Sequence, residues 1–133
     1  MSFLTNLNWR YATKKFNGDV VSAENLAKIT DAIQFAPSAT GTQPYHIVVA
    51  SGELKDRLII SSGQTDKLGC SHLFVFSSRI DYPTRAKKQI ENTAKISNVS
   101  VESLVGLAAS VERTTTKLPT QLREWASRQA YIA

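Results

Sequence analysis

Residues Ala36–Ala50 read APSATGTQPYHIVVA, and this stretch joins two segments of opposite character. The preceding residues 22–35 carry apolar side chains at helical spacing, and Pro37 disfavours helical backbone at the residue before it. After Pro44 the chain becomes apolar and rich in β-branched residues, which is typical of a strand. The stretch therefore predicts a helix that ends near Phe35, a loop of small polar residues and a buried strand.

The rest of the chain continues this mixture of helix and strand. GELKDRLIIS returns to helical spacing, SHLFVFSS is a second strand candidate, and three segments after Pro83 are helical in pattern: TRAKKQIENTAKI, SVESLVGLAASVERT over residues 100–114, and LPTQLREWASRQAYIA, with Pro119 in its first turn. Two strands are too few for a stable sheet. We therefore expect one domain, 1–133, that is incomplete at its C-terminus or completes its sheet with a partner subunit.

Composition narrows the classes of function. The chain has 133 residues, 42% of them hydrophobic, and 16 Lys plus Arg against 11 Asp plus Glu. The net charge of +5 favours an anionic partner such as nucleic acid, acidic lipid or a phosphate-bearing cofactor. Cys70 is the single cysteine, and His46 and His72 have no partner at metal-ligand spacing, so we expect a reducing compartment and no metal site. Without a membrane-length apolar run, the prediction is a cytoplasmic protein.

The segment RYATKKF, Arg10–Phe16, is the first candidate site. Arg10 and Lys14 would point the same way if the segment were helical or turn-like. A guanidinium suits a phosphate or a pair of carbonyls, and an ammonium can sit close to a developing anion. A solvated basic turn is the alternative, and spacing alone favours it.

The loop between Pro37 and Pro44 is the second candidate. It carries hydrogen-bonding side chains of small or moderate size, Gly41 permits close approach of backbone to a ligand, and the two prolines limit its freedom. An ordinary helix-to-strand connection explains the same composition. A third loop, SSGQTDKLG, places Gly63, Gln64 and Lys67 before a strand, where either a flat ligand or solvent would suit them.

Taken in order, RYATKKF, APSATGTQPYHIVVA, CSHLFVF and WASRQAYIA resemble the FMN-dependent nitroreductase family, close to its oxygen-insensitive NAD(P)H nitroreductase and dihydropteridine reductase branch. The resemblance covers essentially the whole chain, and four ordered motifs are more specific than any one. It implies an α+β nitroreductase fold, with helices around a central, mostly antiparallel sheet. It also implies an intertwined homodimer that binds FMN at the subunit interface, with this chain as the N-terminal portion.

The same resemblance implies a set of cofactor contacts. Along the ribityl-phosphate and pyrimidine edge of FMN it would place Arg10, Tyr11, Ala12 and Lys14. Lys14 is the catalytic candidate, because its charge would stabilise the reduced flavin near N1 and O2. From the loop it would bring Pro37, Ser38, Ala39 and Gly41 to the flavin of the other subunit, and Gly63 and Gln64 would add contacts from before the second strand.

The implied reaction is ping-pong hydride transfer from NAD(P)H through flavin N5 to a nitroaromatic, quinone or pteridine acceptor. Three positions depart from the family pattern: Ala12 replaces a Ser, Gly63 an Asn, and Asp66 a Lys or Gln. Family chains also continue into further strands and a basic pair that holds the FMN phosphate. The alternative function is a non-enzymatic dimeric basic module that binds nucleic acid or a nucleotide; the enzyme hypothesis expects neither nucleic acid nor membrane as a partner.

Overall fold

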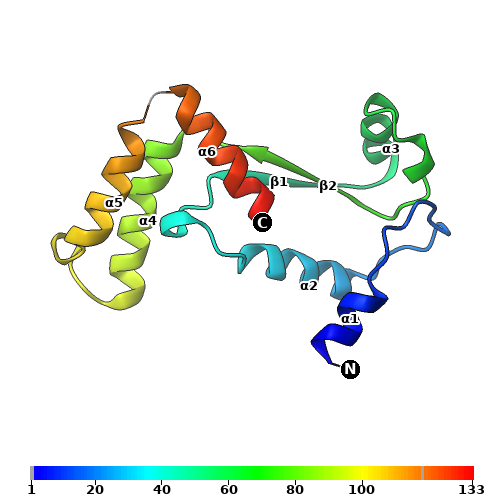
Figure 1. The fold of residues 1–133 in the computed structure, drawn as a ribbon, viewed down its shortest axis with the longest axis horizontal. Coiled ribbons are helices and arrows are strands. Elements are labelled where there is room, and N and C mark those ends of the chain that lie inside the picture. The colour runs from blue at the N-terminus through cyan, green and yellow to red at the C-terminus, as the bar shows by residue number, and fades with distance from the viewer. Residues whose placement is uncertain (1, 118) are drawn as a thin grey trace. The chain divides into compact units, whose positions relative to one another are not determined.

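A computed structural model describes residues 2–117 and 119–133. It is helix-rich with a small sheet, which confirms the α+β class (Figure 1). Its elements, in order, are α1 (Phe3–Trp9), α2 (Ala23–Gln34), the 3-10 turn η1 (Ala39–Gly41), β1 (Tyr45–Ala50), α3 (Gly52–Ser61), η2 (Thr65–Lys67), β2 (Leu73–Ser78), α4 (Tyr82–Ser97), η3 (Val101–Ser103), α5 (Val105–Thr115) and α6 (Pro119–Ile132).

The predicted elements are largely confirmed, but the prediction of a buried strand is wrong for β1: in the part of the chain that the structure describes, the sheet has only two strands, and Ala50 is the one buried residue of β1. Helix α2 ends at Gln34, one residue before the expected limit, and α6 begins at Pro119, a proline in the first helical position, where its missing N–H costs nothing. Helix α1 was not predicted. The Ser2 hydroxyl caps it by accepting a hydrogen bond from the Thr5 N–H at 3.2 Å.

The single helix predicted over residues 100–114 is wrong at its start. The Ser100 hydroxyl accepts from the Ser103 N–H, which favours the separate 3-10 turn η3. Leu104 then takes a non-helical conformation, φ −89° and ψ 38°, and α5 begins at Val105. The apolar spacing was read correctly, but a local side-chain cap interrupts the first turn.

The chain divides into two compact units. The first unit comprises residues 1–23 and 49–74, and the second comprises 24–48 and 75–133. Both strands cross the boundary, and they pair as one two-stranded sheet. The Arg79 N–H donates to the Pro44 carbonyl at 2.8 Å, so the end of β2 lies against the start of β1 and the strands are antiparallel. The prediction of one domain stays a prediction.

The second unit has a helical core. Tyr82, Ala86 and Val111 are buried, and they are packed by Ile90, Leu107, Leu122 and Trp125. The Tyr82 and Trp125 rings meet edge to face, with centroids 4.8 Å apart. Helices α4 and α5 lie side by side in this unit (Figure 1). The core thus forms where α4, α5 and α6 pack against one another.

The first unit buries much less. Among its described residues only Ala50, Lys55 and Ile59 are buried, and α1 buries none. One of these three is a lysine, which is unusual because a buried ammonium requires hydrogen-bond acceptors around it. Within the described residues, no helix is long and apolar enough to cross a membrane.

Candidate functional site

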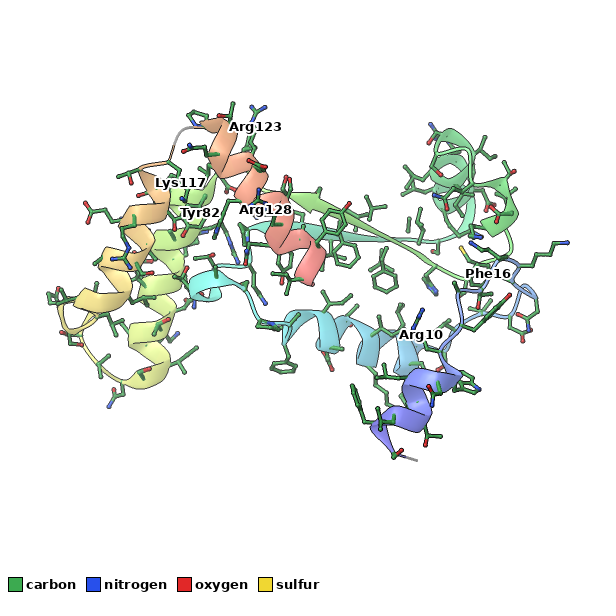
Figure 2. The ribbon with its side chains drawn as sticks, viewed as in Figure 1. Arg10, Phe16, Tyr82, Lys117, Arg123 and Arg128 are labelled. Atoms are coloured by element: carbon green, nitrogen blue, oxygen red, sulfur yellow. The ribbon has the colours of Figure 1, made fainter. Side chains whose placement is uncertain are left out.

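The basic segment, which we define as residues 10–22, follows α1 directly. Arg10 is the C-cap of α1, and none of the segment forms a helix, strand or turn. The helical or turn-like condition under which Arg10 and Lys14 would share a face is therefore not met. Every residue of the segment is exposed, including Tyr11 and Ala12 (Figure 2 labels Arg10 and Phe16).

The cationic groups of the basic segment are uncommitted. Among the described residues, no ion pair or side-chain hydrogen bond engages Arg10 or Lys14. The main chain at Lys14 is held, because its carbonyl accepts a hydrogen bond from Lys67 Nζ at 3.2 Å. The same ammonium pairs with Asp66, and this hydrogen bond holds the pKa of Asp66 below its usual range, with the Lys14 charge acting in the same direction. Lys14, near a carboxylate that Lys67 already neutralises, and Arg10 on the same segment suit an anionic ligand.

Gly63 and Gln64 lie in the same unit as the basic segment. Gly63 has φ +74° and ends α3, its N–H donating to the Ile60 carbonyl at 3.0 Å. Glycine and asparagine are the residues that most often take this left-handed position after a helix. The change from the family's Asn to Gly63 therefore preserves the backbone while removing an amide side chain. The Gln64 side chain is exposed.

The small-residue loop, residues 37–44, is stabilised mainly by its own hydrogen bonds. The Ser38 hydroxyl accepts from the Gln43 N–H at 2.9 Å, and the Ala39 carbonyl accepts from the Thr42 hydroxyl at 3.0 Å. Thr42 and Pro44 are fully buried. Side chains that were candidates for ligand contact are thus used to fold the loop. Pro37, Ala39 and Gly41 remain exposed, and they offer small apolar surface rather than donors.

One glutamine from outside the loop hydrogen-bonds it, and a second lies close against it. The Gln129 side-chain oxygen accepts from the Ala39 N–H at 2.7 Å, and Gln129 is only 8% exposed. Gly41 has φ +67°, and a Cβ added there would stand 2.8 Å from Gln89 Nε2. Neither contact was predicted, because Gln89 is 48 residues from Gly41 in the sequence and Gln129 is 90 residues from Ala39. Gln129 did carry a signal, since it belongs to the WASRQAYIA motif.

Two side chains beside the loop, Arg85 and Tyr45, each have a buried polar atom without a hydrogen-bond partner. Arg85 donates to the Thr42 carbonyl at 3.2 Å, while its Nε has no partner, and the Tyr45 hydroxyl has none either. Burial raises the pKa of Tyr45, opposed by the neighbouring Gln43 side chain and by the Arg85 charge. The Gln43 amide cannot fully serve Tyr45, because its Nε2 donates to the Gln34 carbonyl at 2.6 Å.

The predicted contacts therefore fall into two groups. The basic segment, Gly63 and Gln64 belong to the first unit, and residues 37–41 belong to the second. Within the first unit the structure brings Lys14 to the residues that follow Gln64. Among the described residues, no group of three His, Cys, Asp or Glu side chains could hold a metal ion.

Comparison with known proteins identifies the fold family. The sequence model of the Nitroreductase family matches residues 7–133. The chain belongs to the nitroreductase family. It is similar to the oxygen-insensitive NAD(P)H nitroreductases of Salmonella typhimurium, at 33% identity, and Enterobacter cloacae, at 36%. Each alignment is 78 positions long, and it covers 53% of this chain and 36% of the curated relative.

Solved structures of nitroreductases share the fold. A nitroreductase family protein of Streptococcus pneumoniae TIGR4 superposes with a TM-score of 0.77 at 22% identity. A nitroreductase-like protein of Streptococcus mutans superposes with a TM-score of 0.67 at 19% identity. Both alignments cover 98% of this chain and 66% of the solved one. The chain thus spans about two thirds of the length of these solved structures.

Proposed function

We propose that this chain is part of an FMN-dependent oxidoreductase that passes a hydride from NAD(P)H to nitroaromatic, quinone or pteridine acceptors in a ping-pong reaction. The observation that carries the proposal is the pair of uncommitted cations, Arg10 and Lys14, on an exposed segment of a nitroreductase-family chain. The names of the two curated relatives support the oxidoreductase class.

The donor set of the first unit fits FMN. The phosphate and the pyrimidine edge of a flavin are electron-rich, and Arg10 and Lys14 supply charged donors without losing an existing partner. Tyr11, Ala12, Gly63 and Gln64 are exposed in the same unit and would complete this edge of the site. Bound FMN would supply the hydride chemistry. Lys14 would stabilise negative charge at N1 and O2, which is preorganised electrostatic stabilisation.

The small-residue loop fits a second role, contact with the flat ring. Pro37, Ala39 and Gly41 are exposed and carry little bulk, so backbone can approach a planar group. The Ser38 hydroxyl oxygen accepts from the Gln43 N–H, so Ser38 would contribute its O–H as a donor held in a fixed position. The loop's internal bonds keep its conformation fixed before a ligand binds, which lowers the entropy lost on binding.

We also propose that the protein works as a homodimer. Helix α1 exposes Phe3, Leu4, Leu7 and Trp9, with Trp9 84% exposed, and it buries no residue of its own. An apolar helix without a covered face is typical of a surface that a partner covers. In the family resemblance this partner is a second copy of the chain, and it would bring the small-residue loop to the first copy's flavin.

Substitution of Lys14 tests the proposed function in the full-length protein. Lys14→Ala removes a charge that faces the flavin, so we expect FMN affinity or the rate of flavin reduction by NAD(P)H to fall about tenfold. Lys15→Ala is the matched control, since it removes the same charge one residue along. FMN titration by fluorescence and stopped-flow reduction measure the two quantities. A protein that takes up no FMN but binds nucleic acid with strong salt dependence would support the basic-module alternative instead.

A further inference from the structure

We infer that Lys55 and Gly69 are positioning residues for Lys14, acting through the docking loop, which we define as residues 67–71. One side of the docking loop is hydrogen-bonded to Lys55 of α3, and the basic segment contacts the other side of the loop. This placement of the segment is a property of the chain itself. Its consequence for flavin binding rests on the proposed function.

The side of the docking loop that faces α3 is held by Lys55. The Lys55 side chain is buried, and its Nζ donates to the Leu68 carbonyl at 2.8 Å and to the Cys70 carbonyl at 2.7 Å. Asp56 Oδ1, 3.0 Å away, provides an ion pair. The two carbonyls accept hydrogen bonds from the ammonium, and Asp56 Oδ1 compensates its charge without a hydrogen bond. A buried lysine hydrogen-bonded to main-chain carbonyls fixes backbone position, because moving either carbonyl away would leave a buried N–H donor unpaired.

Every second residue of the docking loop, at positions 67, 69 and 71, contacts the basic segment. Lys67 Nζ donates to the Lys14 carbonyl at 3.2 Å, and the Ser71 hydroxyl accepts from the Val21 N–H at 2.8 Å. Between them, Gly69 lies so close to Phe16 that an added Cβ would stand 2.9 Å from the Phe16 carbonyl oxygen (Figure 2 labels Phe16). Residues 68 and 70 therefore face the lysine of α3, while 67, 69 and 71 face the segment.

The basic segment depends on these contacts for its position. It forms no helix or strand and is exposed throughout, so neither backbone pairing nor a core fixes Lys14. A bulkier residue at 69 would displace the main chain of Phe16, two residues from Lys14. The obstacle is backbone, which cannot move aside as a flexible side-chain end can. The close approach thus requires glycine on steric grounds.

Gly69→Ala tests this placement without any ligand. Gly106→Ala is the control, because the space around Gly106 is open. Limited trypsin digestion of the full chain measures cleavage after Lys14 and Lys15, and cleavage after Lys87 and Lys88 on α4 reports general loosening. We expect Gly69→Ala to raise cleavage in the basic segment about tenfold, with α4 and the control unchanged. Cleavage equal to wild type, or an equal rise at both places, would overturn the inference.

Lys55→Met addresses the other side of the loop. It leaves two carbonyls unpaired, so we expect the same selective rise in cleavage of the basic segment. If that variant does not fold, Ser71→Ala removes the link to Val21, together with the hydrogen bond between the Ser71 hydroxyl and His72 Nδ1, and should raise cleavage by a smaller, still selective factor. No change with Ser71→Ala or with Gly69→Ala would contradict the docking of the segment on this loop.

A double substitution connects the placement to Lys14. If Gly69 acts by positioning Lys14, FMN should bind Gly69→Ala more weakly than wild type, and Lys14→Ala combined with Gly69→Ala should bind no more weakly than Lys14→Ala alone. Fully additive losses would overturn the assignment to Lys14. A wild-type protein that does not bind FMN would refute the proposed function, and the digestion experiment would then decide the positioning by itself.

Discussion

The small-residue loop and the basic segment contain the two halves of the proposed flavin site, and they obtain their order in different ways. The loop bonds to itself through Ser38 and Thr42 and is supported by a helical core. Within the basic segment the Asp19 N–H donates a hydrogen bond to the Asn17 side chain, and the segment contacts the docking loop through Lys14 and Val21. The conformation of the small-residue loop should therefore resist mutation elsewhere in the chain. The basic segment is held by a few contacts, so the loss of any one of them should loosen it.

The largest expected effect comes from the core of the second unit. Tyr82→Ala removes a fully buried ring that meets Trp125 edge to face, so we expect the free energy of unfolding to fall by about 3–5 kcal/mol. Urea denaturation measures this. Tyr131→Ala is the control, because that ring is 94% exposed and should change stability by less than about 0.5 kcal/mol. Amide exchange should rise in the small-residue loop and not in the basic segment; the reverse pattern would break the comparison.

A smaller effect is expected at Gly41. Gly41→Ala forces a side chain into a conformation with φ +67°, which costs about 1–2 kcal/mol. The steric conflict with Gln89 adds little, because the end of that side chain can move. Thermal or urea unfolding should therefore show lower stability for Gly41→Ala, whereas Gly69→Ala should mainly loosen the basic segment. Equal global destabilisation by both substitutions would show that the two regions do not differ in this way.

The smallest expected effect is a pH dependence beside the small-residue loop. Arg79 hydrogen-bonds Asp81 and lowers the pKa of that carboxyl to about 2. Because the folded-state pKa lies below the unfolded value, the stabilisation is complete above about pH 4 and is lost as pH falls toward 2. Asp81 is 42% exposed, so we expect less than about 1 kcal/mol.

Urea titrations at several pH values test the Asp81 contribution. Wild type should lose more stability than Asp81→Asn between pH 4 and pH 2, and 0.5 M salt should reduce the difference. Parallel curves for the two proteins would exclude a contribution from this ion pair.

The sequence predicted most of the elements, and the reasons are local. Pro37 ends α2, Pro119 begins α6, a β-branched run marks β1, and a short run of Leu, Phe and Val marks β2. The break at Leu104 was missed because apolar spacing continues across it, while the Ser100 cap that causes it acts over only three residues. Helix α1 has apolar residues at helical spacing, Phe3, Leu4 and Leu7, but it is only seven residues long, which is too short for that spacing to establish a helix.

The sequence predicted which residues form the candidate site but not which residues hold them in place. The ordered motifs identified Arg10, Lys14 and the small-residue loop, because the order of motifs can be read directly from one sequence. The supports at Gln129, Gln89, Lys55 and Gly69 depend on contacts between residues 13 to 90 apart, and nothing local distinguishes a supporting glutamine from a solvated one.

By itself the sequence determined the family, the α+β class and the cationic residues offered to a ligand, since these follow from residue type, spacing and order. The tertiary structure alone decided that Ser38 and Thr42 are used within their loop and that a buried Lys55 fixes the docking loop. It also decided that Gly69 is needed for sterics rather than for backbone conformation. Each of these depends on which groups, distant along the chain, come within hydrogen-bonding or van der Waals distance after folding.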